Sequence, residues 1–300
     1  PCSWGSLEFE GLEGSALPFT RMLDELAETG YTGTELGDWG FMPTEPSLLR
    51  QHLTQRNLTM LGAFVPVALR HADAHAPGAE AALRVAKLLA AVAAPDSKPY
   101  LVLADENGAV PERTANAGRL PDGMSLTDAE WRTFAQGAEL IAKKVHDDTG
   151  LETVFHHHCA GYVEMPDEID QLLTRTKPEL LNLVFDTGHY AYGTGAPSAE
   201  IVLEGLHRFG DRIHYVHFKD CSPHIAQHAR QNEWDYFQAV GKGVFCELGQ
   251  GCVDFGAIAQ WLREKHYAGW ICVEQDVLPG MGAPKQSAQR NRDYLRALGL

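Results

Sequence analysis

Four short runs of sequence decide the expected fold, and in each an apolar stretch ends in side chains that can bind a metal ion. The runs are Phe155-His156-His157-His158, Phe185-Asp186-Thr187-Gly188-His189, Tyr215-Val216-His217-Phe218-Lys219-Asp220 and Val273-Glu274-Gln275-Asp276. Helical segments separate them, which is typical of parallel strands that alternate with helices. Because the carboxyl ends of parallel strands meet at one rim, the runs are expected to face a common point. Imidazole and carboxylate groups gathered there would suit a divalent metal.

The same alternation extends through the chain. Strands are predicted at 4–9, 33–36, 58–67 and 100–104, at the run that ends in the three histidines, and at 181–186, 213–218 and 270–274. Helices are predicted between them, for example at 45–55, 78–93, 127–150, 166–174, 198–209, 255–265 and 285–298. About eight units of this kind predict a (β/α)8 TIM barrel.

The length favours one barrel domain over residues 1–300. A closed barrel takes roughly 250 residues, so room remains for two long loops on the active face, near 106–126 and 220–253. An open doubly wound sheet is the alternative, but no G-x-G-x-x-G turn follows the first predicted strand.

The bulk properties exclude several classes of partner. The formal net charge is −15 and no basic run occurs, which argues against nucleic-acid binding. No window approaches eighteen consecutive apolar residues, so no membrane segment is expected. The six cysteines form no CxxC pair and are expected to be reduced, which favours a cytoplasmic protein. A small polar ligand is therefore expected, and a homo-oligomer is compatible with the sequence.

The metal-capable runs resemble one family in order and spacing. The resemblance lies in His156-His157-His158-Cys159-Ala160-Gly161, Asp186-Thr187-Gly188-His189, Val216-His217-Phe218-Lys219-Asp220, Gly249-Gln250-Gly251-Cys252-Val253-Asp254 and Gly269-Trp270-Ile271-Cys272-Val273-Glu274. They are similar to the inosose (2-keto-myo-inositol) dehydratase branch of the xylose-isomerase-like barrels, which also contain sugar epimerases. This resemblance implies a metal-dependent enzyme that acts on a polyol or keto-sugar beside its carbonyl group.

The resemblance implies that Asp186, His217 and Glu274 bind the metal. The fourth ligand is expected to be His156, where the sugar-epimerase relatives have a glutamate; the alternative is that His156 lies behind the ligands and a neighbouring group or water completes the site. Side chains alternate along a strand, so His156 and His158 share a face while His157 points toward the helices. Mn²⁺ or Co²⁺ is the expected ion, and Zn²⁺, Fe²⁺ and Mg²⁺ also suit these ligands.

Four further residues are candidates for catalysis. Glu35, at the end of the second predicted strand, or His158 is expected to remove the proton next to the carbonyl group. Lys219 or His189 is expected to help a hydroxyl group leave as water. Lys219 could instead form a surface ion pair with Asp220, and His189 is expected on a loop above the barrel.

Elimination of water from a keto-inositol is the expected reaction, and several rivals use the same scaffold. A ketose epimerase or isomerase would return the proton elsewhere, and a lyase acting on 3-keto-glycosides would expel a different leaving group. Phosphodiester cleavage in damaged DNA would need more metal ligands and a basic groove. A sugar-binding barrel without catalysis is the non-enzymatic alternative.

Overall fold

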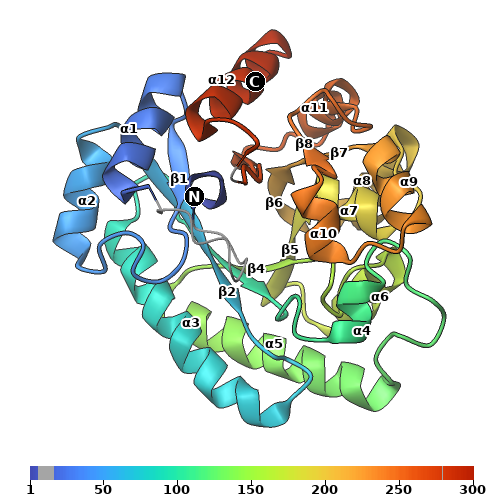
Figure 1. Ribbon diagram of the computed structural model, residues 1–300. Coiled ribbons are helices and arrows are strands. Elements are labelled where there is room, and N and C mark those ends of the chain that lie inside the picture. The colour runs from blue at the N-terminus through green and yellow to red at the C-terminus, as the bar shows by residue number, and fades with distance from the viewer. Residues whose placement is uncertain (6–16, 279) are drawn as a thin grey trace.

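Seven parallel strands form a curved sheet that helices surround, in a computed structural model that describes residues 1–5, 17–278 and 280–300 (Figure 1). The strands follow one another in the sheet as β1 (Gly33–Glu35), β2 (Thr59–Pro66), β3 (Tyr100–Ala104), β4 (Thr153–His156), β5 (Leu181–Asp186), β6 (Ile213–Phe218) and β9 (Ile271–Val273). All six neighbouring pairs are parallel. The ring of strands is nearly closed, as a TIM barrel requires.

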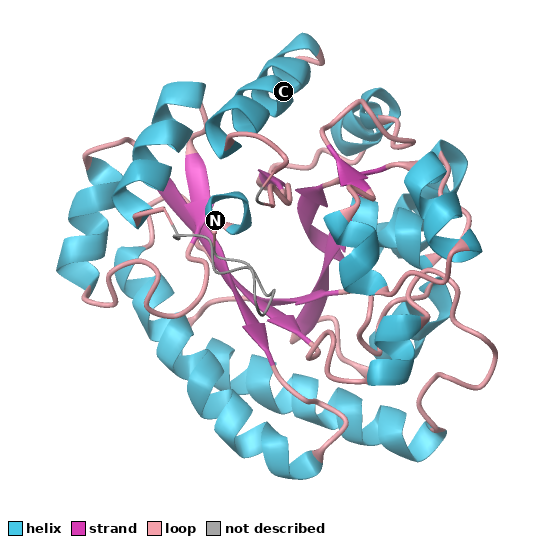
Figure 2. Cartoon of the chain, viewed as in Figure 1, coloured by secondary structure: helices cyan, strands magenta, loops and turns pink. Residues whose placement is uncertain are grey.

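Helices cover the outside of this ring, with the strands in the middle (Figure 2). The longer helices between or after the strands are α1 (Phe19–Thr29), α2 (Pro46–Thr54), α3 (Ala72–Val92), α5 (Asp128–Thr149), α6 (Pro166–Arg175), α8 (Ala199–Phe209), α11 (Phe255–Glu264) and α12 (Pro284–Ala297). Their buried faces join the outer faces of the strands in one large apolar core. Each described helix is too short or too polar to cross a membrane.

A second, smaller core fills the inside of the barrel. Successive strands contribute one residue each to this layer, namely Leu61, Val102, Val154, Val184 and Tyr215. Phe64, Tyr100, Trp270 and Cys272 pack against it. Because side chains alternate along a strand, the residues two positions further also point inward, at the carboxyl-terminal rim. The predicted metal ligands His156, Asp186 and His217 lie in this upper layer.

The prediction of a first strand at 4–9 is wrong for the part that the structure describes. Cys2–Trp4 forms a single turn of 3-10 helix, and the rest of the predicted strand lies outside the described residues. The Trp4 ring is buried, and its Nε1–H donates to Glu25 Oε2 at 2.6 Å. The Ser3 hydroxyl donates to the Gln275 carbonyl, which places this turn beside the end of β9. The described sheet therefore has seven strands, and the amino-terminal turn lies near its open edge.

Local sequence signals located most helices, and α3 shows their limit. Thr127 and Glu130 form a capping box at the start of α5, where the predicted helix 127–150 begins, and Gly30 ends α1 in the left-handed conformation. However, α3 begins at Ala72 rather than at the predicted residue 78, and it includes Pro77. A ring nitrogen of His75 hydrogen-bonds the Leu69 carbonyl at 2.7 Å, and this contact holds the extra turn in place.

The two segments expected as long loops follow β3 and β6 and contain short elements. The first includes α4 (Pro111–Ala115), and the second includes β7 (Asp220–Cys221), α9 (Pro223–Gln231), α10 (Tyr236–Gly241) and β8 (Phe245–Cys246). Buried Asp220 anchors the second segment, because its carboxylate accepts backbone N–H groups of Cys221, Gly249, Gly251 and Val253 at 2.8 to 3.0 Å. Asp220 is thus a structural anchor and does not pair with Lys219.

Candidate active site

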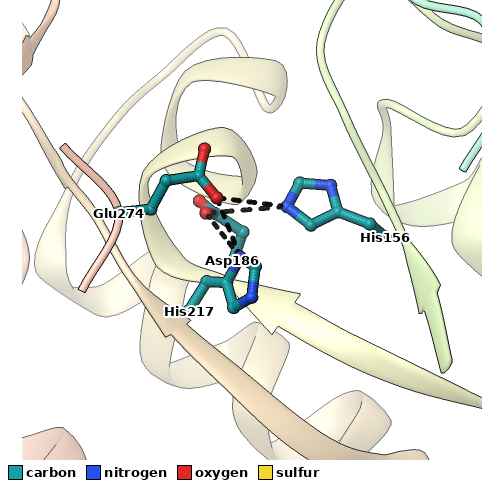
Figure 3. A group of neighbouring side chains, drawn as sticks. All are labelled: His156, Asp186, His217 and Glu274. Atoms are coloured by element: carbon teal, nitrogen blue, oxygen red, sulfur yellow. Dashed lines mark hydrogen bonds and ion pairs between the residues drawn. The ribbon is translucent and has the colours of Figure 1, made fainter. Parts of the chain in front are cut away.

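Four side chains with metal-ligand chemistry meet above the inner core of the barrel (Figure 3). Three lie two residues beyond members of that core: His156 follows Val154, Asp186 follows Val184, and His217 follows Tyr215. Glu274 comes directly after β9, where its backbone N–H still donates to Phe218 O at 3.0 Å. The alternation of side chains along neighbouring strands therefore brings the four to one point.

The distances between these groups fit a single ion. His156 Nε2 lies 3.8 Å from both Asp186 Oδ2 and Glu274 Oε2. His217 Nδ1 lies 4.0 Å from Asp186 Oδ2 and 2.8 Å from Glu274 Oε2. With metal–ligand bonds of about 2.1 Å, two ligands on a tetrahedral ion are about 3.4 Å apart, so small side-chain movements would suffice.

Asp186 Oδ2 supplies an independent test of this fit. The oxygen is fully buried and has no hydrogen-bond partner among the described residues, whereas Asp186 Oδ1 accepts the His189 backbone N–H at 2.7 Å. A buried carboxylate oxygen without a partner is costly. An ion held between the two histidines and Glu274 would satisfy it, so the residues present fit a divalent metal.

The pKa values of the cluster reflect burial and crowding. Burial and the nearby charge of Glu274 raise the pKa of Asp186 to about 7, and burial lowers the pKa of His156 to about 4. Burial opposes charge on His217 as well, but Glu35 and Glu274 together raise its pKa to about 10. His156 is therefore neutral and ready to bind a cation, whereas His217 must lose a proton first.

Two predicted catalytic residues contact this cluster. Glu35 Oε1 accepts hydrogen bonds from His217 Nε2 at 2.9 Å and from the Tyr215 hydroxyl at 2.8 Å. Lys219 is buried, and its Nζ pairs with Glu274 Oε1 at 2.7 Å and Asp276 Oδ2 at 2.9 Å. Burial would lower the pKa of Lys219, but the charges of Asp276 and Glu274 raise it well above its usual value, so the side chain stays cationic.

The other two candidates lie at different depths. His158 lines the central cavity, and its Nδ1 lies 2.7 Å from the Cys159 carbonyl. A carbonyl oxygen can only accept, so Nδ1 carries the proton and Nε2 keeps a free lone pair. His189 lies on α7 (Thr187–Gly193) rather than on a loop, and it is fully buried. Its ring packs on His158 with centroids 3.8 Å apart, behind the cavity wall.

A cavity lies above the cluster. Aromatic side chains from separate parts of the chain form part of its wall, namely Phe64 on β2 and Tyr236 and Phe237 on α10. Charged groups line it as well, among them Glu35, Asp38, Lys219, Glu274 and Asp276. A small polar molecule with an apolar ring face would match this combination.

Sequence reasoning missed the role of Tyr215 and the aromatic wall on α10. Tyr215 stands two residues before His217 and so faces the same way, a signal that was available from the alternation alone. Tyr236 and Phe237 follow Asp235, which caps α10. No local pattern in the sequence shows that this helix folds back over the barrel.

The comparisons with known proteins identify the family of the fold. A family model described as "Xylose isomerase-like TIM barrel" matches residues 23–298. The inosose dehydratase of Geobacillus kaustophilus (strain HTA426) is 31% identical over 298 residues, which cover 99% of this chain and 92% of the relative. The inosose dehydratase of Lacticaseibacillus casei is 30% identical, over 99% of this chain and 95% of the relative.

Solved structures share the fold at lower sequence identity. The probable 3-DHS dehydratase AsbF from Bacillus anthracis superposes with a TM-score of 0.68 at 15% identity, covering 93% of this chain and 94% of that one. The 3-keto-D-glucoside 4-epimerase YcjR from E. coli gives 0.66 at 16% identity, covering 94% of both chains. A barrel protein from Mycobacterium smegmatis, solved in complex with magnesium, gives 0.64 at 14% identity, covering 93% of this chain and 87% of that one.

Proposed function

Because this chain belongs to the xylose isomerase-like TIM-barrel family, we propose that it is a metal-dependent dehydratase that removes water from a keto-inositol or a related keto-sugar. The convergence of His156, Asp186, His217 and Glu274 beneath a cavity with both aromatic and charged walls carries the proposal. The similarity to inosose dehydratases over nearly the whole chain supports the choice of reaction.

The four converging side chains would hold the ion, with Mn²⁺ or Co²⁺ as the expected occupant. A divalent ion bound there would polarise the substrate carbonyl and lower the barrier to forming negative charge on its oxygen. The protein's part is to fix the substrate beside the groups that move protons. Phe64, Tyr236 and Phe237 would pack against the apolar face of the ring and exclude water from it.

His158 is proposed as the base, because its Nε2 lone pair is free and the residue lines the cavity. Its Nε2 takes the proton from the carbon next to the carbonyl group, and the electron pair of that C–H bond forms an enediolate. When the enediolate collapses, that electron pair forms a double bond between this carbon and the next one, and the bond from the next carbon to its hydroxyl group breaks.

Lys219 is proposed to protonate the departing hydroxide. Its ammonium group has three N–H donors, of which one bonds Glu274 Oε1, while Asp276 Oδ2 is an ionic neighbour at 2.9 Å. Another N–H can donate to the leaving oxygen, which departs as water. The two carboxylates hold the ammonium group in place, and His189 supports His158 from behind through ring packing.

A ketose epimerase or isomerase is the alternative on this barrel, and a lyase acting on 3-keto-glycosides is another. An epimerase needs a second base on the opposite face of the sugar to return the proton. His156 stands where the epimerase relatives are expected to have a glutamate, and burial keeps its pKa at about 4. Because His156 Nε2 faces Asp186 and Glu274, its lone pair would be given to the ion and could not return a proton, which favours elimination.

The test is turnover of 2-keto-myo-inositol by protein loaded with Mn²⁺ or Co²⁺, followed by NMR and by ultraviolet absorption of the enolisable dione product. The proposal expects loss of one water per substrate, and loss of that activity in Asp186→Asn and Glu274→Gln. Deuterium exchange without elimination would indicate an epimerase instead. Turnover of 3-keto-glycosides alone would indicate the glycoside lyase, and no turnover with any metal would reject this substrate.

A further inference from the structure

We propose that Glu35 is a positioning residue, which acts through His217 and fixes the ring so that Nδ1 faces the metal ligands. The inference rests on the proposed metal site and goes beyond it, because Glu35 lies outside the group of four. It also replaces the expectation that Glu35 is the base. The argument concerns one hydrogen-bonded chain that runs from Tyr215 through Glu35 and His217 to Glu274.

The two ring nitrogens of His217 have different surroundings. Nδ1 lies 2.8 Å from Glu274 Oε2 and 4.0 Å from Asp186 Oδ2, so it faces the cluster. Nε2 points to the other side and lies 2.9 Å from Glu35 Oε1. If Nδ1 gives its lone pair to an ion, the ring proton must be on Nε2, and a carboxylate is the natural acceptor. Glu35 would thus select the tautomer and the ring orientation that binding requires.

A second hydrogen bond, from Tyr215, holds Glu35 itself in place. The Tyr215 hydroxyl donates to the same oxygen, Oε1, at 2.8 Å. The Tyr215 ring is fully buried, stacks on Tyr100 with centroids 5.2 Å apart, and packs edge-on against His217 at 4.9 Å. A tyrosine fixed on β6 therefore sets the position of a carboxylate on β1. This rigidity is what an orienting group needs, because an ill-placed acceptor would not hold the imidazole.

The backbone around Glu35 leaves room for this arrangement. Glu35 is paired in register with Gly62 of the neighbouring strand. A Cβ atom at Gly62 would lie 2.9 Å from the Tyr100 carbonyl oxygen and 3.8 Å from Glu35 Oε1. Glycine at this position is therefore required by the close approach of the Tyr100 carbonyl, and the Glu35 carboxylate lies beside it at an ordinary contact distance.

A second ion is the competing interpretation of the same residues. Donor atoms of Glu35, His217 and Cys272 also lie within 4.8 Å of one another. However, Glu35 Oε1 already accepts two hydrogen bonds, and a second ion would need His217 to lose the protons of both nitrogens. With one ion on His217 Nδ1 and the Glu35 carboxylate bonded to the Nε2–H group, both ring nitrogens have a partner and only one proton is lost.

The experiment compares metal binding in Glu35→Ala, Glu35→Gln and Tyr215→Phe with the wild type. Affinity for Co²⁺ is measured by chelator competition, and the visible Co²⁺ spectrum reports the ligand geometry. Loss of an outer-shell partner typically weakens metal binding about 10- to 100-fold, which is expected for Glu35→Ala. Glu35→Gln keeps an oxygen that can accept both hydrogen bonds, so it should stay near the wild type in affinity and spectrum. Tyr215→Phe should fall between them.

A catalytic base would behave differently. Glu35→Gln would then lose kcat as completely as Glu35→Ala, while Co²⁺ affinity and the spectrum stayed unchanged in both, and that result would overturn the proposal. Two equivalents of Co²⁺ bound to the wild type, falling to one in Glu35→Ala, would overturn it in favour of a second ion. Circular dichroism of the metal-free variants checks that they fold, and Tyr215→Phe keeps the test open if Glu35→Ala does not.

These outcomes remain separate from the proposed reaction. If the wild type binds Co²⁺ and Glu35→Ala binds it more weakly, the positioning role stands even when 2-keto-myo-inositol is not turned over. If the wild type dehydrates the substrate without binding metal, the reaction stands and the positioning role falls.

Discussion

Asp186 is the residue whose surroundings are hardest to explain without a cation. Its Oδ2 atom is buried and unpartnered within the described chain, while Oδ1 caps α7 through the His189 N–H. The two oxygens therefore have separate tasks. One fixes the start of a helix, and the other is left for a ligand.

Asp186→Asn separates these tasks, because asparagine keeps an oxygen for the cap and removes the charge. In the wild type, saturating Mn²⁺ should stabilise the fold by about 2.7 kcal/mol at 100 times Kd, and this gain should disappear in the variant. The pKa of Asp186 is higher in the folded protein (about 7) than its ordinary value, so the fold favours the protonated carboxyl group. The metal-free protein is therefore more stable at low pH and loses this stability as pH rises through about 7. Metal-free Asp186→Asn should therefore be at least as stable as the wild type at pH 8. Thermal unfolding with and without Mn²⁺ decides this, and an undiminished metal response would contradict the assignment.

The pH dependence of metal affinity follows from the same groups. His217, with a pKa of about 10, must release one proton on binding, and Asp186, with a pKa of about 7, releases a second at lower pH. The logarithm of the association constant should rise by about one per pH unit between about 7 and 10, and by about two below 7. His156, with a pKa of about 4, adds no proton in this range. Calorimetry in buffers of different ionisation enthalpy counts the protons, and a flat profile would disprove this assignment of protonation states.

Single residues were predictable from the sequence where a local rule applied. The meeting of parallel strand ends at one rim and the family resemblance predicted that His156, Asp186 and His217 would lie together, and the structure brings them together. The bond between Tyr215 and Glu35 joins residues far apart in the chain, so no local pattern could reveal it. The alternative ion pair of Lys219 with Asp220 is wrong, because Lys219 pairs with Glu274 and Asp276 while Asp220 accepts backbone N–H groups.

At the scale of elements, the segment from β7 to β8 matters most for the cavity, since it carries α10 and the aromatic wall. Asp220 holds this segment through four backbone N–H groups. Asp220→Asn replaces one acceptor oxygen by an N–H donor, so two of the four backbone N–H groups lose their acceptor. At about 1–3 kcal/mol for each buried group, the variant should lose about 2–6 kcal/mol of stability in urea unfolding.

Asp254→Asn is the matched control for this change. Asp254 caps α11 by accepting the Ala257 N–H at 2.9 Å, and asparagine caps helices about as well as aspartate. Its stability should stay close to that of the wild type. Equal losses in the two variants would show that Asp220 has no special role as an anchor.

Elements with strong local signals were predictable, and those set by distant contacts were not. The capping box of Thr127 and Glu130 can be recognised in the sequence and marks the start of α5. The early start of α3 depends on His75 reaching the Leu69 carbonyl beside Gly137 of α5, where a Cβ would lie 2.4 Å from the His75 ring. The 3-10 turn at Cys2–Trp4 depends on contacts with Glu25 and Gln275. Such contacts exist only once the barrel has formed.

At the scale of the whole molecule, the net charge of −15 separates the proposed activity from cleavage of damaged DNA. A DNA-binding surface needs clustered Lys and Arg to replace counterions. A 20-base-pair duplex with an abasic site should therefore show no change in fluorescence anisotropy with micromolar protein at low salt. Binding that weakens as salt increases would revive the DNA hypothesis.

The central claim is that one divalent ion lies between the ends of β4, β5 and β6 and the residue after β9. Anomalous diffraction from a crystal grown with Mn²⁺ tests it most directly. The account predicts a single strong peak, about 2.0–2.3 Å from His156 Nε2, Asp186 Oδ2, His217 Nδ1 and a Glu274 carboxylate oxygen. A peak at another place in the cavity, more than about 3 Å from Asp186 Oδ2, would contradict it.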